Sequence, residues 1–314
     1  MSIKLPHKYT EIPFISIHCL FLFFFGFSCI SLSIYLRMCN SYPWYTTLPI
    51  SITGIYSLFP VIHDGSHGTV SNNSALNYGM SFLAGLPFFF APYPTWRFIH
   101  LRHHQFTNIE DKDPDFYSGG NLSSKWLLPL RWITHIIHYY KFFFITISHV
   151  LRSKCKRKME GNTCSLDSIY DLSNDQIIQN NTKVLIISFI SIAINISIAT
   201  YSALYGAFDT LFVLWIMPSA LTIILLIFLF DYLPHRYFKH NINTNKYRTT
   251  NMTHGICSKK GRANSFIALI TCNQLTYHNI HHLWPRIPFQ KYHLVWNEYS
   301  DELIALETPV QSIF

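Results

Sequence analysis

The sequence has little charge. Only 13% of its 314 residues are Asp, Glu, Lys or Arg, whereas a typical soluble domain carries about 25%. Hydrophobic residues make up 49% of the chain and aromatic residues 17%. This composition argues against an ordinary water-soluble protein and predicts contact with lipid.

Several familiar motifs are also absent. The seven cysteines are odd in number and contain no CxxC pair, which argues against a disulfide framework or a thiolate zinc site. The sequence has no Walker loop and no dinucleotide fingerprint, so no nucleotide site can be argued. The sequence has no internal repeat. We expect it to associate with a membrane and with a lipid substrate, and not with nucleic acid.

Four long apolar stretches are present instead. Each approaches the roughly 20 residues that a helix needs to cross a bilayer. A short link with Gly206 and Asp209 predicts that the last two stretches form a helical hairpin. We therefore predict one all-α integral membrane domain over residues 1–314. Its four expected transmembrane helices cover approximately residues 12–36, 47–62, 184–205 and 210–230.

Two further apolar stretches are ambiguous. Residues 75–92 are interrupted by glycine and proline, and residues 126–150 carry basic side chains and histidines. Both fit helices that lie in the membrane interface better than helices that span it. A protein with six spans is the alternative.

The basic residues predict the orientation. Residues 97–183 hold twelve Lys or Arg and residues 236–291 hold nine, whereas the links after the first and third spans hold at most one each. The positive-inside rule then places both termini and the histidines described below on the cytoplasmic side of a multi-pass protein. The basic run 152–158 fits contact with an anionic leaflet, or alternatively a dock for an acidic electron carrier. The polar stretch 160–182 predicts a loop.

Eight histidines lie in three short clusters near the ends of apolar stretches. Their spacing is H-x3-H once and H-x2-H-H twice. Side chains three or four residues apart share a face of a helix, so each cluster can aim two or three imidazoles at one point. The clusters are His63 and His67; His100, His103 and His104; and His278, His281 and His282.

This pattern predicts a metal centre. Neutral imidazole is the commonest protein ligand for metals, and imidazole with few thiolates suits iron, zinc, copper or nickel. Eight imidazoles are too many for one ion, so we expect at least two ions. The sequence lacks the Glu-x-x-His pairs that hold iron in soluble carboxylate bundles, which separates this site from that class.

Three residues near the clusters are further candidates. His235 follows the fourth apolar stretch and is predicted to be a ninth ligand. Asp231, four residues earlier, would share a helical face with His235 and could bind metal through water or orient a histidine; a solvated helix end is the alternative. Asp64 invites the same two interpretations.

The other histidines have no such grouping. His135 and His138 have helical spacing but no evident third partner, so they are predicted to be structural, like the remaining six. The turn Asp111–Asp115 is rich in carboxylates. It is interpreted either as a polar loop that caps a helix or as support for the neighbouring ligands. The remaining six are His7, His18, His149, His240, His254 and His293.

At these residues the chain resembles the membrane fatty acid desaturase and hydroxylase superfamily. The resemblance covers roughly residues 58–299 and includes the three histidine clusters and the helical hairpin between the second and third. It implies two ferrous iron ions and dioxygen as a co-substrate. It also implies an electron donor such as ferredoxin or a cytochrome–reductase chain.

Finer phrases are similar to the cyanobacterial-type β-carotene ring hydroxylases. The clearest is YHNIHHLWPRIP, residues 277–288. This resemblance implies hydroxylation of a carotenoid β-ring. One alternative is a fatty acyl desaturase or hydroxylase of the same superfamily. The other is a histidine-rich membrane metal transporter, which the near absence of charge within the spans disfavours.

Overall fold

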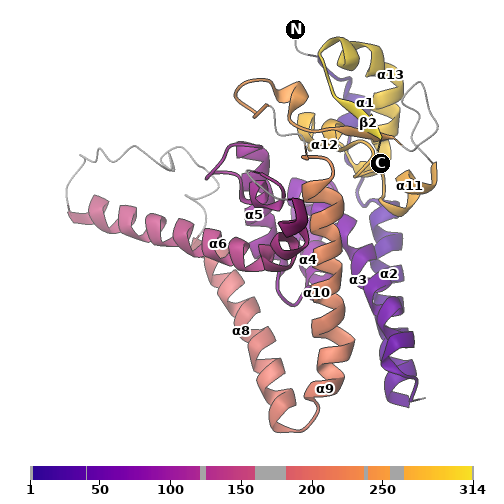
Figure 1. Cartoon of the computed structure of the whole chain (residues 1–314), viewed down its shortest axis with the longest axis vertical. Helices are drawn as coiled ribbons and strands as arrows, with labels where there is room; N and C mark the ends of the chain where they lie inside the picture. The colour runs from indigo at the N-terminus through magenta and orange to yellow at the C-terminus, as the bar shows by residue number, and fades with distance from the viewer. Residues whose placement is uncertain are drawn as a thin grey trace.

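The structure is a computed structural model that describes residues 3–39, 41–120, 125–159, 182–236, 240–254 and 265–312. Within these ranges the chain is mostly helical, as the apolar stretches predict (Figure 1). The longer helices up to the second histidine cluster are α2 (Ile17–Cys39), α3 (Trp44–His67), α4 (Ser74–Gly85) and α5 (Tyr93–Phe106). They are followed by α6 (Leu128–Met159), α8 (Thr182–Leu204) and α10 (Met217–Leu226).

Short elements complete the chain. Two strands, β1 (Met252–His254) and β2 (Val310–Ser312), pair in parallel and tie the segment after the hairpin to the C-terminal end. The short helices are α1 (His7–Thr10), η1 (Pro114–Ser118), η2 (Lys125–Leu127), α9 (Phe208–Leu211), η3 (Phe212–Ile216), η4 (Ile227–Tyr232) and η5 (Lys246–Arg248). The C-terminal region adds α11 (Ser265–Ile270), α12 (His278–Leu283), η6 (Phe289–Lys291) and α13 (Tyr292–Ala305).

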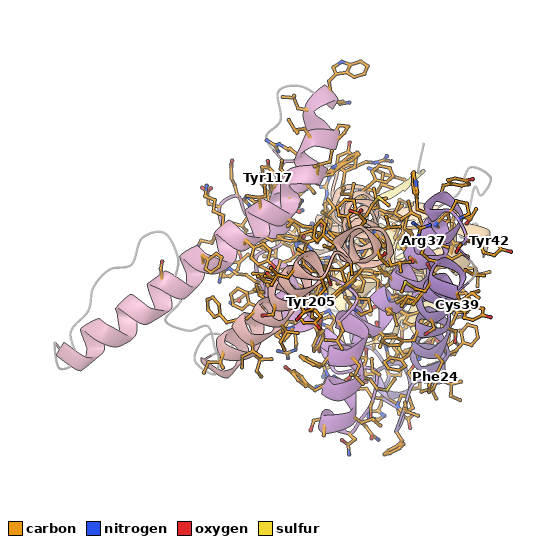
Figure 2. The ribbon with its side chains drawn as sticks, turned by 90° about the horizontal axis from the view of Figure 1, so that it is seen from below. Phe24, Arg37, Cys39, Tyr42, Tyr117 and Tyr205 are labelled. Atoms are coloured by element: carbon orange, nitrogen blue, oxygen red, sulfur yellow. The ribbon has the colours of Figure 1, made fainter. Side chains whose placement is uncertain are left out.

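Four helical segments in the described ranges are long and apolar enough to cross a membrane, as predicted. Helices α2, α3 and α10 run alongside one another, α8 slants away from α10 beyond the hairpin turn, and α5, α12 and α13 lie toward the other end (Figure 1). Large apolar side chains cover their outer faces; Phe24 of α2 is 61% exposed, and Tyr205 in the turn after α8 is 71% exposed (Figure 2). Such exposure is unfavourable in water and expected in lipid. The segments are Ile17–Cys39, Trp44–His67, Ile186–Leu204 and Phe208–Tyr232.

The two ambiguous stretches behave differently from each other. Helix α6 lies across the direction of α8 and α10 (Figure 1), as expected for a helix in the interface. The prediction of one helix over residues 75–92 was wrong. Helix α4 ends at Gly85 and α5 begins at Tyr93, with a turn between them. Pro87 and Pro92 lie in this turn, and proline has no N–H with which to continue a helix.

The second span is longer than predicted. Helix α3 does not stop before the first histidine cluster but runs through it to His67. It ends at Gly68, which has φ +74° and donates its backbone N–H to the Asp64 and Gly65 carbonyls, as is typical of a left-handed helix cap. The cluster therefore sits on the last turn of a membrane helix, where its two histidines share one face.

The predicted hairpin is present. Gly206, at φ +70°, turns the chain between α8 and α9. The fourth span is not a uniform α-helix, because the wider π-helical segments η3 and η4 flank α10. Insertions of this kind are frequent at functional sites, and η4 leads directly toward His235.

Helices α2 and α3 make a backbone-to-backbone crossing. A Cβ atom at Gly54 would lie 2.7 Å from the Gly26 carbonyl oxygen, and one at Gly26 would lie 2.7 Å from Leu58. Beside this crossing the buried Ser51 hydroxyl donates to Ser33 at 2.7 Å. Small residues and shared hydroxyls are how helices associate where lipid removes the hydrophobic drive.

We predict that Gly54→Ala destabilises the protein by about 1–3 kcal/mol, because the nearest atom to the added methyl group is a backbone oxygen, which cannot move aside as a side chain can. Thermal unfolding in detergent measures this as a lower midpoint. Gly79→Ala is the control, since a Cβ atom there would meet nothing within 4 Å. Equal midpoints for the two variants would contradict the proposed crossing.

Candidate metal centre

The structure brings all nine predicted histidines together at the end of the membrane helices where α5 and α12 gather. They come from the last turn of α3, from α5, from the turn after η4 and from α12. The site is buried, with His63 only 3% exposed and His281 fully covered. Segments more than 200 residues apart in sequence thus meet at one point.

The histidines form two groups of four and one link between them. Within each group, ligand atoms lie within 4.8 Å of one another, which is close enough to surround a single ion. His104 joins the groups: its Nε2 lies 2.8 Å from Nε2 of His281, and its ring stacks on His282 with centroids 4.3 Å apart. The first group is His63, His67, His100 and His281, and the second is His103, His235, His278 and His282.

Within both groups the Nε2 atoms point at one another. In the first group, Nε2 of His67 lies 2.8 Å from that of His100. In the second, Nε2 of His278 lies 3.1 Å from those of both His235 and His282. At this separation a proton or a metal cation has to lie between the nitrogen atoms, because two unprotonated nitrogens repel each other.

The hydrogen-bond partners of the outward-facing Nδ1 atoms show which ring nitrogen carries the proton. Nδ1 of His103 donates to the Asp113 carboxylate at 2.8 Å, and Nδ1 of His278 donates to the Gln274 backbone carbonyl at 3.1 Å. Oxygen atoms of this kind only accept hydrogen bonds, so the proton sits on Nδ1 and the Nε2 lone pair faces the centre. Lone pairs converging from several imidazoles are the arrangement that binds a metal cation.

The protonation equilibria support the same state. Burial, reinforced by neighbouring imidazoles, lowers the pKa of His100, His104 and His281 well below 6.5 and that of His278 to about 3. These rings are therefore neutral at pH 7, as metal ligands must be. His103 differs. Burial disfavours its charged form, but Asp113 and Asp115 outweigh burial and raise its pKa to about 9. Metal binding at His103 would consequently release a proton.

Asp113 both caps a helix and supports a neighbouring histidine, the two roles considered for the carboxylate-rich turn Asp111–Asp115. It caps η1 by accepting from the Asp115 backbone N–H at 2.9 Å, and it also accepts from the Asn108 backbone N–H at 2.7 Å. Together with its bond to His103, these contacts hold the carboxylate and the imidazole in one orientation. Asp64 fits its predicted supporting role, since it lies 3.4 Å from Nδ1 of His63 and accepts from the Phe289 backbone N–H at 3.2 Å.

Two sequence-based interpretations need correction. Asp231 was expected to share a face with His235, but the chain leaves the helix after Tyr232 and Asp231 turns to Tyr139 of α6 instead, at 3.0 Å. His135 was expected to lack partners of metal-binding type, yet it lies with Asp115 and Asp231 in a separate buried group. Both results arise from α6 packing on η1 and η4, which sequence spacing does not reveal.

Sequence reasoning missed three supporting residues. The Asn108 side-chain oxygen lies 3.2 Å from Nδ1 of His235, and the Thr107 hydroxyl lies 3.3 Å from Nδ1 of His282. The Tyr292 hydroxyl lies 2.9 Å from Nδ1 of His281. Thr107 and Asn108 follow the second cluster by one helical turn, and this spacing could have pointed to them. No local signal points to Tyr292.

These observations fit a metal centre with two ions. Each group of four imidazoles can hold one ion, with His103 releasing its proton on binding, and the two groups meet at His104. The donor set is all nitrogen, which suits iron, zinc, copper or nickel alike. The nine predicted histidines therefore lie together, and both their role as ligands and the identity of the metal stay predictions.

We predict that Asp113→Asn weakens metal retention about 10- to 100-fold, because an amide has one acceptor oxygen where the carboxylate uses two. Metal content after dialysis against graded chelator measures the change. Asp111→Asn is the matched control, since Asp111 is exposed and its φ of +64° suits asparagine. If Asp113→Asn keeps its metal as well as the control does, the role of Asp113 is disproved.

Comparisons with known proteins agree with the site. The fatty acid desaturase family model matches residues 42–313. The chain is 31% identical over 117 residues to the sn-1 oleoyl-lipid 12-desaturase of Picosynechococcus, covering 32% of this chain and 33% of that protein. It is 24% identical over 286 residues to the dihydrorhizobitoxine desaturase of Bradyrhizobium elkanii, covering 87% of this chain and 70% of that protein.

A third relative adds an electron donor in its name. The sn-1 acyl-lipid omega-3 desaturase (ferredoxin) of Synechocystis is 32% identical over 88 residues, covering 28% of this chain and 23% of that protein. The matched length is thus less than two thirds of the first and third of these relatives. The family model, by contrast, covers most of this chain and includes all nine histidines. Together with the four apolar helices it indicates a membrane protein and an oxidoreductase, and the chain belongs to the fatty acid desaturase family.

Proposed function

We propose that this protein removes hydrogen from an unactivated C–H bond of a lipid acyl chain, with dioxygen as oxidant and two iron ions held by the nine histidines. The observation that carries the proposal is the pair of four-histidine groups joined by His104. The proposed product is a carbon–carbon double bond. The support comes from the site geometry and from desaturase relatives.

The protein and the metal have separate tasks. Iron would supply the oxidising chemistry, which belongs to the cofactor. The chain orients the imidazoles, excludes water and positions the lipid. The outcome depends on how closely the second C–H bond approaches the metal, since a misplacement of about 1 Å can change rates 100-fold.

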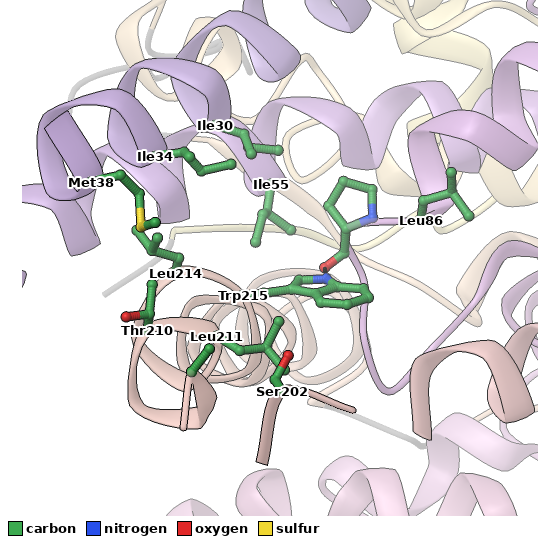
Figure 3. Close-up of a pocket in the computed structure, with 12 residues that line it drawn as sticks. Ile30, Ile34, Met38, Ile55, Leu86, Ser202, Thr210, Leu211, Leu214 and Trp215 are labelled. Carbon is green, nitrogen blue, oxygen red and sulfur yellow. Dashed lines mark hydrogen bonds between the residues drawn. The ribbon is translucent and has the colours of Figure 1, made fainter. Parts of the chain in front are cut away.

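An apolar cavity between the membrane helices is the binding site that we propose for the acyl chain. It holds about 460 Å³, within the roughly 300–1,000 Å³ of small-molecule sites. Figure 3 shows Ile34 and Met38 of α2 on one side and Leu211 and Leu214 of the hairpin on the other. Trp215 lies at its centre and donates to the Pro87 carbonyl at 2.9 Å.

Helix α3 leads from this cavity to the histidines. Ile55 lines the cavity, whereas Phe59 and Ile62 line a smaller apolar pocket one to two turns farther along. Positions 55, 59 and 62 share a face of α3, and His63 follows. The ring of Phe59 lies 5.6 Å from that of His63. We infer that the acyl chain follows this face toward the metal centre.

The proposal also includes a source of electrons for the reaction and an orientation of the protein in the membrane. We infer a donor such as ferredoxin or a cytochrome–reductase chain, since one relative is named for ferredoxin. We place both termini and the metal centre on the cytoplasmic side because of the distribution of basic residues. The side chains of the basic run 152–158 lie outside the described residues, as does most of the polar stretch 160–182.

The carotenoid interpretation has no support beyond the sequence phrases that suggested it. The relatives compared above are named as desaturases, two of them acting on acyl lipids. An acyl substrate is therefore the better-supported choice. Carotenoid ring hydroxylation remains a prediction that the following experiment separates from it.

The test is expression in a host that makes both β-carotene and saturated or monounsaturated lipids. We expect new double bonds in the acyl chains and no hydroxylated carotenoid, measured by gas and liquid chromatography with mass detection. His281→Ala should abolish the product, because His281 contacts both His63 and His104.

The matched control is His138→Ala. The His138 ring stacks on Tyr117 at 4.4 Å and belongs to neither four-histidine group. It should keep most of the activity at equal membrane levels. Hydroxylated carotenoid without new unsaturation would overturn the acyl proposal in favour of the carotenoid one.

A second prediction concerns the cavity. Ser202→Trp should shift the preferred acyl chain to shorter lengths, because Ser202 lines the cavity and the indole would fill part of it. Competition between acyl chains of different length measures the shift, with metal content unchanged. Tyr201→Trp is the control, since Tyr201 is 61% exposed and absent from the lining. An unaltered length preference in Ser202→Trp would exclude the cavity from the substrate path.

A further inference from the structure

A second buried group of metal-binding side chains lies beside the histidine centre and shares no residue with its two four-histidine groups. It consists of Asp115 from η1, His135 from α6 and Asp231 from η4. Each offers one ligand atom, and these atoms lie within 4.8 Å of one another. All three side chains are at most 7% exposed.

The two carboxylates have too few hydrogen-bond donors around them to offset the cost of their burial. Their one described hydroxyl donor is Tyr139, which lies 2.6 Å from Oδ1 of Asp115 and 3.0 Å from Oδ2 of Asp231. A phenol has a single proton, so it can satisfy only one carboxylate at a time. His103 also lies 3.4 Å from Asp115, but its Nδ1 donates to Asp113 at 2.8 Å. Two buried negative charges that share one hydroxyl donor are unfavourable unless a cation or another proton joins them.

His135 provides the independent observation. It is fully covered, and neither ring nitrogen makes a hydrogen bond within the described part of the chain. The Pro114 carbonyl is close to the ring but does not complete a hydrogen bond to it. Tyr117 and Tyr139 pack against the ring, with centroids 5.5 and 4.4 Å away. A buried imidazole without partners, beside two carboxylates, requires an explanation.

We propose that Asp115, His135 and Asp231 bind a third metal ion, a divalent cation separate from those of the nine histidines. Ligand bonds of about 2.0–2.2 Å place two ligands of one ion up to about 4.4 Å apart, so the observed spacing needs only a slight contraction. Two carboxylates neutralise a divalent charge. One nitrogen and two oxygen donors suit zinc, manganese or ferrous iron.

The ion would tie three segments together. The group joins η1, α6 and η4, and Asp115 also lies 3.4 Å from Nδ1 of His103. The ion would therefore fix the interfacial helix α6 to the end of the hairpin, next to the histidine centre. This role is structural and does not depend on which metal the histidines bind.

The test measures how many zinc ions each chain binds. Zinc is used because it is redox-inert. The purified full chain is stripped, dialysed against Zn²⁺, freed of loosely bound metal and analysed by mass spectrometry of the element. We expect His135→Gln to hold one zinc fewer per chain than the unaltered protein, and His138→Gln to hold the same number. The difference of one ion is independent of how many the nine histidines take, so it tests this site even if the proposed function is wrong.

Equal zinc content in His135→Gln and the unaltered protein would overturn the proposal. A second measurement covers the case in which the variant folds poorly. Diffraction from the zinc-loaded protein at the zinc absorption edge should show an anomalous peak within bonding distance of Asp115, His135 and Asp231. An occupied histidine centre with no peak at the three residues would also overturn it.

Discussion

Everything in the site depends on one constraint: imidazole Nε2 atoms face one another at about 3 Å in a buried space. Unless a cation or a proton lies between the nitrogen atoms this arrangement is repulsive, and burial keeps water from relieving it. The chain therefore has to hold the rings in place through other contacts. The outward hydrogen bonds from Nδ1 do this, and they also leave the inner nitrogens unprotonated.

The partners of those outward bonds come from several elements. Asp113 precedes η1, Asn108 follows α5, and Tyr292 begins α13. The second and third clusters and His235 are thus each held by a residue outside their own helix, so the centre depends on how the segments beyond the membrane helices pack on one another. The parallel pair of β1 and β2 helps to hold the C-terminal end of the chain in place.

The membrane helices supply the foundation. The backbone crossing of Gly26 and Gly54 fixes α3 against α2, and α3 carries the first histidine cluster on its last turn. The hairpin delivers His235 from the opposite side through the π-helical segment η4. Interface helix α6 then adds Tyr139 and His135 next to the hairpin end. Metal ligation and helix packing are consequently parts of one assembly.

The sequence predicted much of this. Local periodicity and hydropathy were sufficient for the four apolar helices and for the three histidine clusters, because both are properties of neighbouring residues. His235 was predicted from its place at the end of a span. The break between α4 and α5 was missed, although its prolines were visible, because the stretch was interpreted as a single interfacial helix.

The sequence by itself determined which imidazoles share a helical face. It also determined that these candidate ligands lie at the ends of apolar segments. Only the tertiary structure decided how the clusters divide into two groups, which oxygen atoms orient them, and that Asp231 turns to Tyr139 and His135 rather than to His235. The reason is physical. Helical spacing is set by bonds within one segment, whereas these pairings arise from packing between segments far apart in the chain.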